Sequence, residues 1–133
     1  MCQRLFFAQR LWLVAVLAMV VSVDAVQAAR PNPSVQKTFN KLLGAIQAND
    51  RNTFVADGTQ AVKQGMTQQV MDGLNKQLGS RLKKGSSATY LTDLKLSGYQ
   101  AYLWKVTFKD GGDDTIVRVV LDKAGKVAGF SLQ

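Results

Sequence analysis

Residues 99–109 read YQAYLWKVTFK, and from residue 102 onward large apolar or aromatic side chains occupy every second position. Successive side chains of a β-strand point to opposite faces of a sheet. The stretch therefore predicts a strand with one aromatic side and one mixed side. The aromatic side carries Tyr102, Trp104, Val106 and Phe108, and the mixed side carries Ala101, Leu103, Lys105, Thr107 and Lys109. We expect the aromatic side to face the core.

Further strands are predicted on both sides of this one, at residues 89–97, 115–122 and 126–132, where β-branched and aromatic residues are frequent. The links are Gly98, the loop 110–114 and the turn 123–125. Each link is short enough for a hairpin between antiparallel neighbours. The second half of the chain therefore predicts a four-stranded antiparallel meander.

Three helices are predicted ahead of the strands. The first begins at Asn32 and Pro33, a capping residue followed by a residue suited to the first turn. The second is short, carries Phe54 and Val55, and ends near Gly58. The third follows a capping Thr67 and ends at Gly85. The apolar stripes are Val35, Phe39, Leu42, Leu43 and Ile46 in the first helix, and Val70, Met71, Leu74, Leu78 and Leu82 in the third. Helices followed by a meander predict an α+β fold with the helices on one face of the sheet.

The N-terminus has the pattern of a secretory signal peptide. Arg4 and Arg10 precede a wholly apolar run over residues 11–21, and small residues such as Ala25 and Ala28 follow it. The run has eleven residues, and a membrane-spanning helix needs roughly 20. We predict cleavage after Ala28, which divides the chain into a signal peptide, 1–28, and a single α+β domain, 29–133. The protein is then exported, periplasmic or secreted, with no stable membrane insertion.

The composition excludes much site chemistry. The chain contains no histidine and no glutamate, and Cys2 lies within the predicted signal peptide. A histidine- or cysteine-ligated zinc site and a thiol or histidine nucleophile are therefore not expected, and we predict no metal, no cofactor and no catalytic residue. The net charge of +8 favours an acidic partner. Nucleic acid is not an expected partner, because the lysines are scattered and the protein is predicted to be exported.

The mixed side of the sheet is the predicted partner-binding surface. In the first strand, alternation places Leu91, Asp93 and Lys95 on this side and Tyr90, Thr92, Leu94 and Leu96 on the inner side. In the third strand it places Val117, Val119 and Leu121 inside. The surface then comprises Leu91, Lys95, Leu103, Lys105, Ile116, Arg118 and Val120. Aliphatic side chains among cations are typical of a homodimer contact or a docking site for an acidic protein. The alternative is that a loop or the second helix covers them, and a bulge would invert part of the assignment.

The order of elements resembles that of a known superfamily. Three helices precede the meander, with segments 44–52 and 66–79 in the helical part and the closing stretch LDKAGKVAGF over residues 121–130. This arrangement resembles small exported bacterial domains of unknown function in the nuclear-transport-factor-two-like superfamily, which have a cystatin-like α+β roll. The resemblance implies a curved sheet wrapped around the helices to leave a cavity. It also implies a ligand-binding or dimerising module, or an isomerase or dehydratase with Asp and His or Tyr in the cavity.

Two functions follow as expectations. The first is a non-enzymatic binding module, immunity- or inhibitor-like, that docks a protein partner, a second copy of itself or a small apolar ligand. The ligand pocket would be lined by Tyr90, Tyr102, Trp104 and Phe108, although four rings on one strand face also suit a core. The alternative is a cavity enzyme that uses Tyr90 or Tyr102 with an aspartate. Asp93 falls on the outer side by alternation, so that no partner base is expected there.

Overall fold

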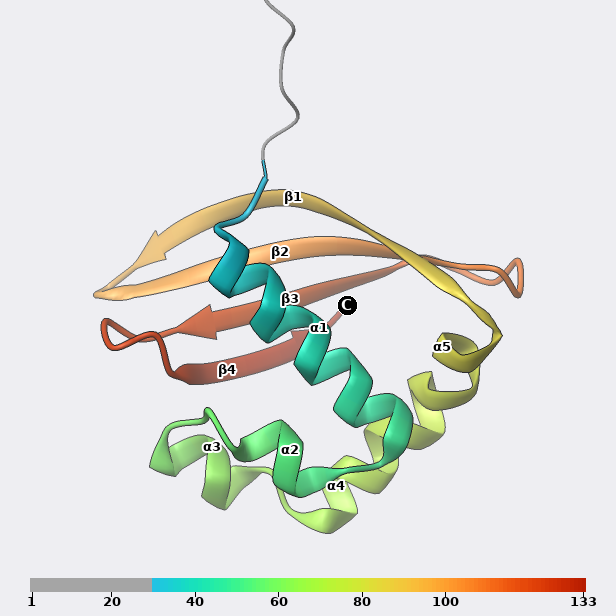
Figure 1. Cartoon of the computed structure of the whole chain (residues 1–133), viewed down its shortest axis with the longest axis horizontal. Helices are drawn as coiled ribbons and strands as arrows, with labels where there is room; N and C mark the ends of the chain where they lie inside the picture. The colour runs from blue at the N-terminus through green and yellow to red at the C-terminus, as the bar shows by residue number, and fades with distance from the viewer. Residues whose placement is uncertain (1–29) are drawn as a thin grey trace, which may run out of the picture.

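The computed structural model describes residues 30–133, and the predicted signal peptide lies outside the described residues. The elements, in chain order, are α1 (Pro33–Ala48), α2 (Arg51–Val55), α3 (Gln60–Gly65), α4 (Gln68–Leu74), the π-helical turn η1 (Asn75–Gly79), α5 (Ser80–Lys84), β1 (Ser86–Leu96), β2 (Tyr99–Phe108), β3 (Thr115–Leu121) and β4 (Val127–Leu132). In Figure 1, α1 crosses in front of the sheet, α2, α3 and α4 lie beyond β4, and α5 lies near the start of β1. This arrangement confirms the α+β class.

The four strands form one antiparallel sheet in the order β1-β2-β3-β4, which confirms the meander. Ser97 and Gly98 form the turn that joins β1 to β2.

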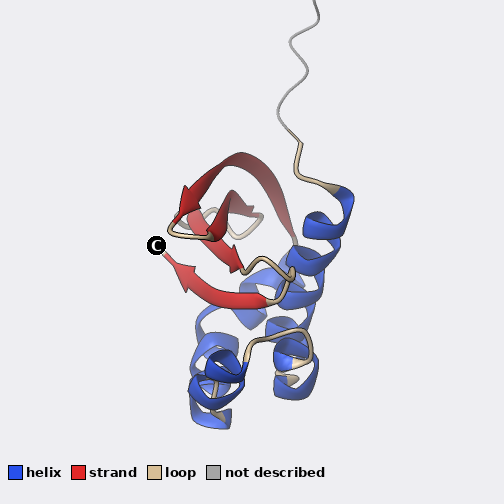
Figure 2. Ribbon diagram, turned by 90° about the vertical axis from the view of Figure 1, so that its left-hand side faces the viewer, coloured by secondary structure: helices blue, strands red, loops and turns tan. Residues whose placement is uncertain are grey.

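 Ser97 has a φ of 47° and Gly98 a φ of 89°, the backbone of a type I′ turn, which suits the twist of two paired strands. The strands curl strongly when viewed along their length (Figure 2).

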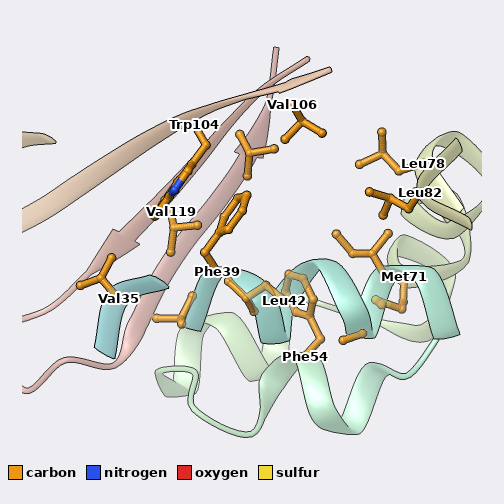
Figure 3. Packing of buried hydrophobic residues seen from close by; sticks show 14 of the residues in the cluster. Val35, Phe39, Leu42, Phe54, Met71, Leu78, Leu82, Trp104, Val106 and Val119 are labelled. Carbon is orange, nitrogen blue, oxygen red and sulfur yellow. The ribbon is translucent and has the colours of Figure 1, made fainter. Parts of the chain in front are cut away.

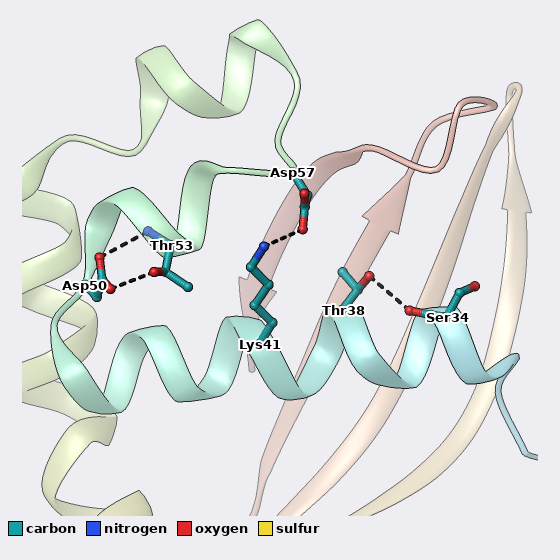
Figure 4. A network of polar contacts seen from close by, with 6 residues as sticks. All are labelled: Ser34, Thr38, Lys41, Asp50, Thr53 and Asp57. Carbon is teal, nitrogen blue, oxygen red and sulfur yellow. Dashed lines mark hydrogen bonds and ion pairs between the residues drawn. The ribbon is translucent and has the colours of Figure 1, made fainter.

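Side-chain caps begin the helices where the sequence predicted them. The Asn32 side chain accepts a hydrogen bond from the backbone N–H of Ser34 at 2.9 Å, and Pro33 follows in the first turn. The Thr67 hydroxyl accepts from the N–H of Val70 at 3.2 Å. These contacts satisfy amides that have no partner within the helix. Asp50 caps α2 in the same way, through Thr53 (Figure 4).

The prediction of three helices is wrong in its divisions, since the described residues form five α-helices and one π turn. α2 ends at Val55, short of the predicted Gly58, and α3 was not predicted at all. α3 begins at a capping Thr59 but contributes no buried side chain, so it has no apolar stripe to reveal it. The predicted third helix comprises α4, η1 and α5. No helix within residues 30–133 combines the length and apolarity needed to cross a membrane.

The π turn ties the α4–α5 rod to the end of α1. The Asn75 side-chain amide donates to the backbone carbonyls of Ile46, at 2.8 Å, and Gln47, at 3.3 Å. A Cβ added at Gly79 would lie 2.5 Å from Asn75 Nδ2, so only glycine leaves room for this amide without a shift. The bridge occupies carbonyls at the C-terminal end of α1, where intrahelical partners run out.

The core forms where the aromatic side of β2 meets α1. The Phe39 ring stacks on the Trp104 ring with centroids 4.1 Å apart and planes 14° from parallel. The Phe54 ring of α2 meets the Phe130 ring of β4 edge to face, with centroids 5.3 Å apart. Figure 3 shows the side chains of the helices and sheet meeting in this layer. The expectation that the aromatic side faces the helices is confirmed.

The two edges of the sheet differ. At the β4 edge, Val127 forms a parallel bridge with Gly58, and its carbonyl accepts from the N–H of Thr59 at 2.9 Å. Lys41 of α1 holds this loop through an ion pair with Asp57 at 2.7 Å (Figure 4). At the other edge, β1 pairs with β2 alone among the described elements. The β1 edge is therefore the longer open one, since within the described chain Val127 is the only residue of β4 that is bridged to the loop.

Truncation of the stacked pair should destabilise the fold severely. We expect Phe39→Ala to lower the free energy of unfolding by about 3–5 kcal/mol, because it leaves a cavity against Trp104. Urea unfolding followed by far-UV circular dichroism measures the loss. The control is Leu91→Ala, at a side chain that is 43% exposed, with an expected change within about 0.5 kcal/mol. Equal losses in the two variants would contradict this core.

Asp110 should make stability depend on pH. The Arg81 side chain lies over the Phe108 ring and donates a hydrogen bond to the Asp110 carboxylate at 2.8 Å. This hydrogen bond lowers the pKa of the carboxyl below its usual 3.8, and the hydrogen bond from the Gly112 N–H lowers it further. Because this pKa is lower in the folded protein, the stabilisation is present above pH 3.8 and is lost as the pH falls through the folded value. We expect Asp110→Asn to be less stable at neutral pH and to lose less stability on acidification. Thermal unfolding over a pH series tests this, with Asp114→Asn in the same exposed loop as the control.

Candidate functional site

Five of the predicted partner-binding residues come together on the face of the sheet opposite α1. Residues directly opposite one another in paired strands share a face. Lys105 lies opposite Ile116, and Leu103 lies opposite Arg118. Val120 follows two residues after Arg118 on β3 and therefore shares its face. We call Leu103, Lys105, Ile116, Arg118 and Val120 the outer sheet face.

The outer sheet face is half-buried although no described helix lies over it (Figure 2). All five side chains have intermediate exposure, and Ala101 between them is fully buried, as expected where a curled sheet shields its own surface. Arg118 Nε is inaccessible to solvent and has no hydrogen-bond acceptor among the described residues. The second helix does not cover this face, since Phe54 packs on the opposite one. The face thus presents aliphatic area together with two cations.

The prediction that Lys95 lies on this face is wrong, and so is the outward assignment of Asp93. A β-bulge at Leu91 interrupts the register, so that Tyr90 lies opposite Trp104 whereas Thr92 lies opposite Leu103. An extra residue of this kind reverses the alternation beyond it. Asp93 and Lys95 therefore lie on the helix side of the sheet, and the extra residue, Leu91, is exposed.

The bulge also brings unpredicted side chains to the outer side of the sheet. Leu94 lies opposite Ala101, and Thr92 and Leu96 share its side. Leu94 is 47% exposed and Leu96 is 36% exposed. Alternation could not reveal them, because both parities of this strand contain leucine.

The four predicted pocket residues belong to the core or border it. Trp104 is 1% exposed and Phe108 is 4% exposed. Tyr90 and Tyr102 are half-buried, with their ring centroids 5.5 and 6.3 Å from that of Trp104. This placement matches the core alternative for Trp104 and Phe108.

An apolar hollow of about 300 Å³ lies elsewhere, between α3 and β4. Its lining consists of Phe54, Ala61, Val62, Gly65, Met66, Ala128 and Phe130. None of these side chains carries a carboxylate or a hydroxyl. The hollow offers apolar contact to a small ligand but no group for acid–base chemistry.

The bulge places Asp93 on the same side as the two tyrosines. Asp93 lies opposite Tyr102, and its carboxylate accepts a hydrogen bond from the Gln100 side chain at 2.6 Å. Burial raises the pKa of Tyr90 and of Tyr102, and the nearby Asp93 charge raises both further. A phenol with a raised pKa keeps its proton at neutral pH, which does not favour its use as a general base.

Other aspartates support the fold. Asp72 accepts from Gln68 at 2.8 Å and from Asn49 at 3.0 Å, which lowers its pKa. The pKa of Asp50 is lowered by its hydrogen bonds to Thr53. These contacts assign structural roles to both aspartates, and that of Asp50 is to cap α2.

The tyrosine titration gives a direct test of this arrangement. We expect Tyr90 and Tyr102 to deprotonate above the usual pKa of 10.0, and Asp93→Asn to move both pKa values back toward it. A residual shift should remain, because burial is the larger cause. NMR titration of the ring carbons resolves each tyrosine, and the wild type serves as the reference. An unchanged titration in Asp93→Asn would contradict the placement of Asp93.

Comparisons with known proteins show no family for this chain. No family model matches the chain, and no curated protein matches it. A solved structure described as an uncharacterised cystatin-fold protein from Novosphingobium aromaticivorans is similar at 17% identity and a TM-score of 0.42, over 73% of this chain and 95% of that one. The helical cell shape determining protein Pgp2 (K307A mutant) from Campylobacter jejuni is similar at 16% identity and a TM-score of 0.38, over 74% of this chain and 39% of that one. By its own architecture, the chain is an α+β protein with several helices and a four-stranded antiparallel meander.

Proposed function

We propose that this protein is an exported, non-enzymatic binding module whose outer sheet face docks an acidic surface of another protein. The observation that carries the proposal is the composition of this face. Its aliphatic side chains remain partly accessible beside Lys105 and Arg118, while the helices pack on the opposite face. Export remains the expectation from the predicted signal peptide.

The physical basis of docking would be apolar burial guided by charge. Leu103, Ile116 and Val120 supply apolar area that a partner would remove from water. Arg118 and Lys105 supply donors for carboxylates, and arginine is enriched in protein interfaces. The net charge of +8 would speed the encounter with an acidic partner.

The alternative of a cavity enzyme has less support. Tyr90 and Tyr102 keep their protons more tightly than a free tyrosine, and Asp93 is exposed and bound by Gln100. The α3–β4 hollow has neither a tyrosine nor a carboxylate in its lining. A small apolar ligand is the other partner expected from the sequence. It would contact the apolar lining of that hollow rather than the four predicted pocket residues.

Charge reversal on the outer sheet face tests the proposal. We expect Lys105→Glu with Arg118→Glu to reduce capture of an acidic protein from a bacterial envelope extract at least about tenfold, because two attractive contacts become repulsive. Quantitative mass spectrometry of the captured proteins measures the change, and titration with the purified partner confirms it.

The matched control is Lys83→Glu with Lys84→Glu, which makes the same change of net charge at exposed positions at the end of α5. Circular dichroism establishes that each variant is folded. Equal capture by the two double variants, or no protein that distinguishes either from the wild type, would reject the outer sheet face as the docking site.

A further inference from the structure

The outer edge of β1 pairs with no other strand among the described residues. β1 is eleven residues long, and every residue in it except Tyr90 is exposed. A free edge presents backbone N–H and C=O groups that can pair with another strand. The opposite edge of the sheet begins with Val127 already bridged to Gly58.

We infer that two copies of this chain pair antiparallel through their β1 edges, with the two-fold axis at Leu94. The regular part of the edge has natural limits. The bulge at Leu91 interrupts it at one end, and the turn that begins at Ser97 ends it at the other. Residues 92–96 remain between these limits, and Leu94 is their midpoint.

The backbone geometry agrees with this register. In a hairpin closed by a two-residue type I′ turn, the flanking residues Leu96 and Tyr99 form a hydrogen-bonded pair. Bonding then alternates along the strand, so the backbone groups of Leu94 face β2 and those of Asp93 and Lys95 face the open edge. An axis at Leu94 sets Asp93 of each copy opposite Lys95 of the other. The outward-facing backbone N–H and C=O groups of Asp93 therefore meet those of Lys95 in the other copy.

Charge complementarity selects this register over its neighbours. Paired residues share a face, and Asp93 and Lys95 both lie on the helix side. An axis at Leu94 therefore creates two pairs of opposite charge. An axis at Asp93 would set two aspartates against each other, and an axis at Lys95 would set two lysines against each other. Leu94, which is 47% exposed, would meet its own copy on the outer side.

The inferred contact differs from the proposed docking surface. It uses the edge of the sheet, whereas docking of an acidic protein uses the central strands β2 and β3. Five residues a side make a small contact, so we expect a weak, concentration-dependent dimer. Leu94 and Leu96 would extend the apolar area beside the outer sheet face across the two-fold axis.

Charge variants test the pairing by sedimentation velocity of the protein purified after expression of the full chain. We expect Lys95→Asp and Asp93→Lys each to weaken self-association about tenfold or more, because like charges then lie opposite. An equimolar mixture of the two variants should dimerise, since each supplies the charge that the other lacks. Lys76→Asp, at an exposed position of η1 outside both surfaces, is the matched control and should dimerise like the wild type.

A cysteine variant tests the register itself. Leu94→Cys, in a chain carrying Cys2→Ser, should form a disulfide with its own copy under mild oxidation, because this pair lies across the axis. Leu96→Cys should not, since the opposite residue would be Thr92. A wild type that stays monomeric up to millimolar concentration, a monomeric mixture of folded charge variants, or equal cross-linking of both cysteine variants would overturn the inference. Loss of the dimer in Lys105→Asp but not in Lys95→Asp would assign self-association to the outer sheet face instead.

Discussion

The stacking of Phe39 on Trp104 sets the arrangement of the whole molecule. It fixes which face of β2 meets α1, and the meander then assigns a side to the paired residues of β3 and β4 through the register. Packing of two rings at 4.1 Å leaves no space between the layers for solvent at this point. The opposite face of the sheet stays free of the described helices because they are held to this one.

The sequence was sufficient to predict the class, the meander and the side that faces the helices. Regular alternation in residues 99–109 and the capping residues Asn32 and Thr67 carried that information, since both depend on local geometry. The prediction failed where structure depends on a single residue or on tertiary contact. α3 has no buried side chain and thus no periodic signal, and the π turn depends on the contact of Asn75 with α1. The alternation of the first strand assigned Lys95 to the wrong side, because the bulge at Leu91 reverses it.

The cations on the outer sheet face are a lysine and an arginine, and the chain contains no histidine. Docking of an acidic partner would therefore not be switched by pH changes between about 5 and 8, the range in which histidine ordinarily titrates. Ionic strength is the variable that would regulate the encounter, since exposed charges are screened by salt.

The bulge at Leu91 lets β1 carry one residue more than its partner without disturbing the pairing on either side. Tyr90 already lies opposite Trp104 and Thr92 opposite Leu103, so deleting Leu91 would join two segments that already alternate correctly. Asp93, Lys95 and the leucines beyond would keep their sides. Two descendants of such a chain that differ by a single codon in length could therefore share the same sheet surfaces and the same core.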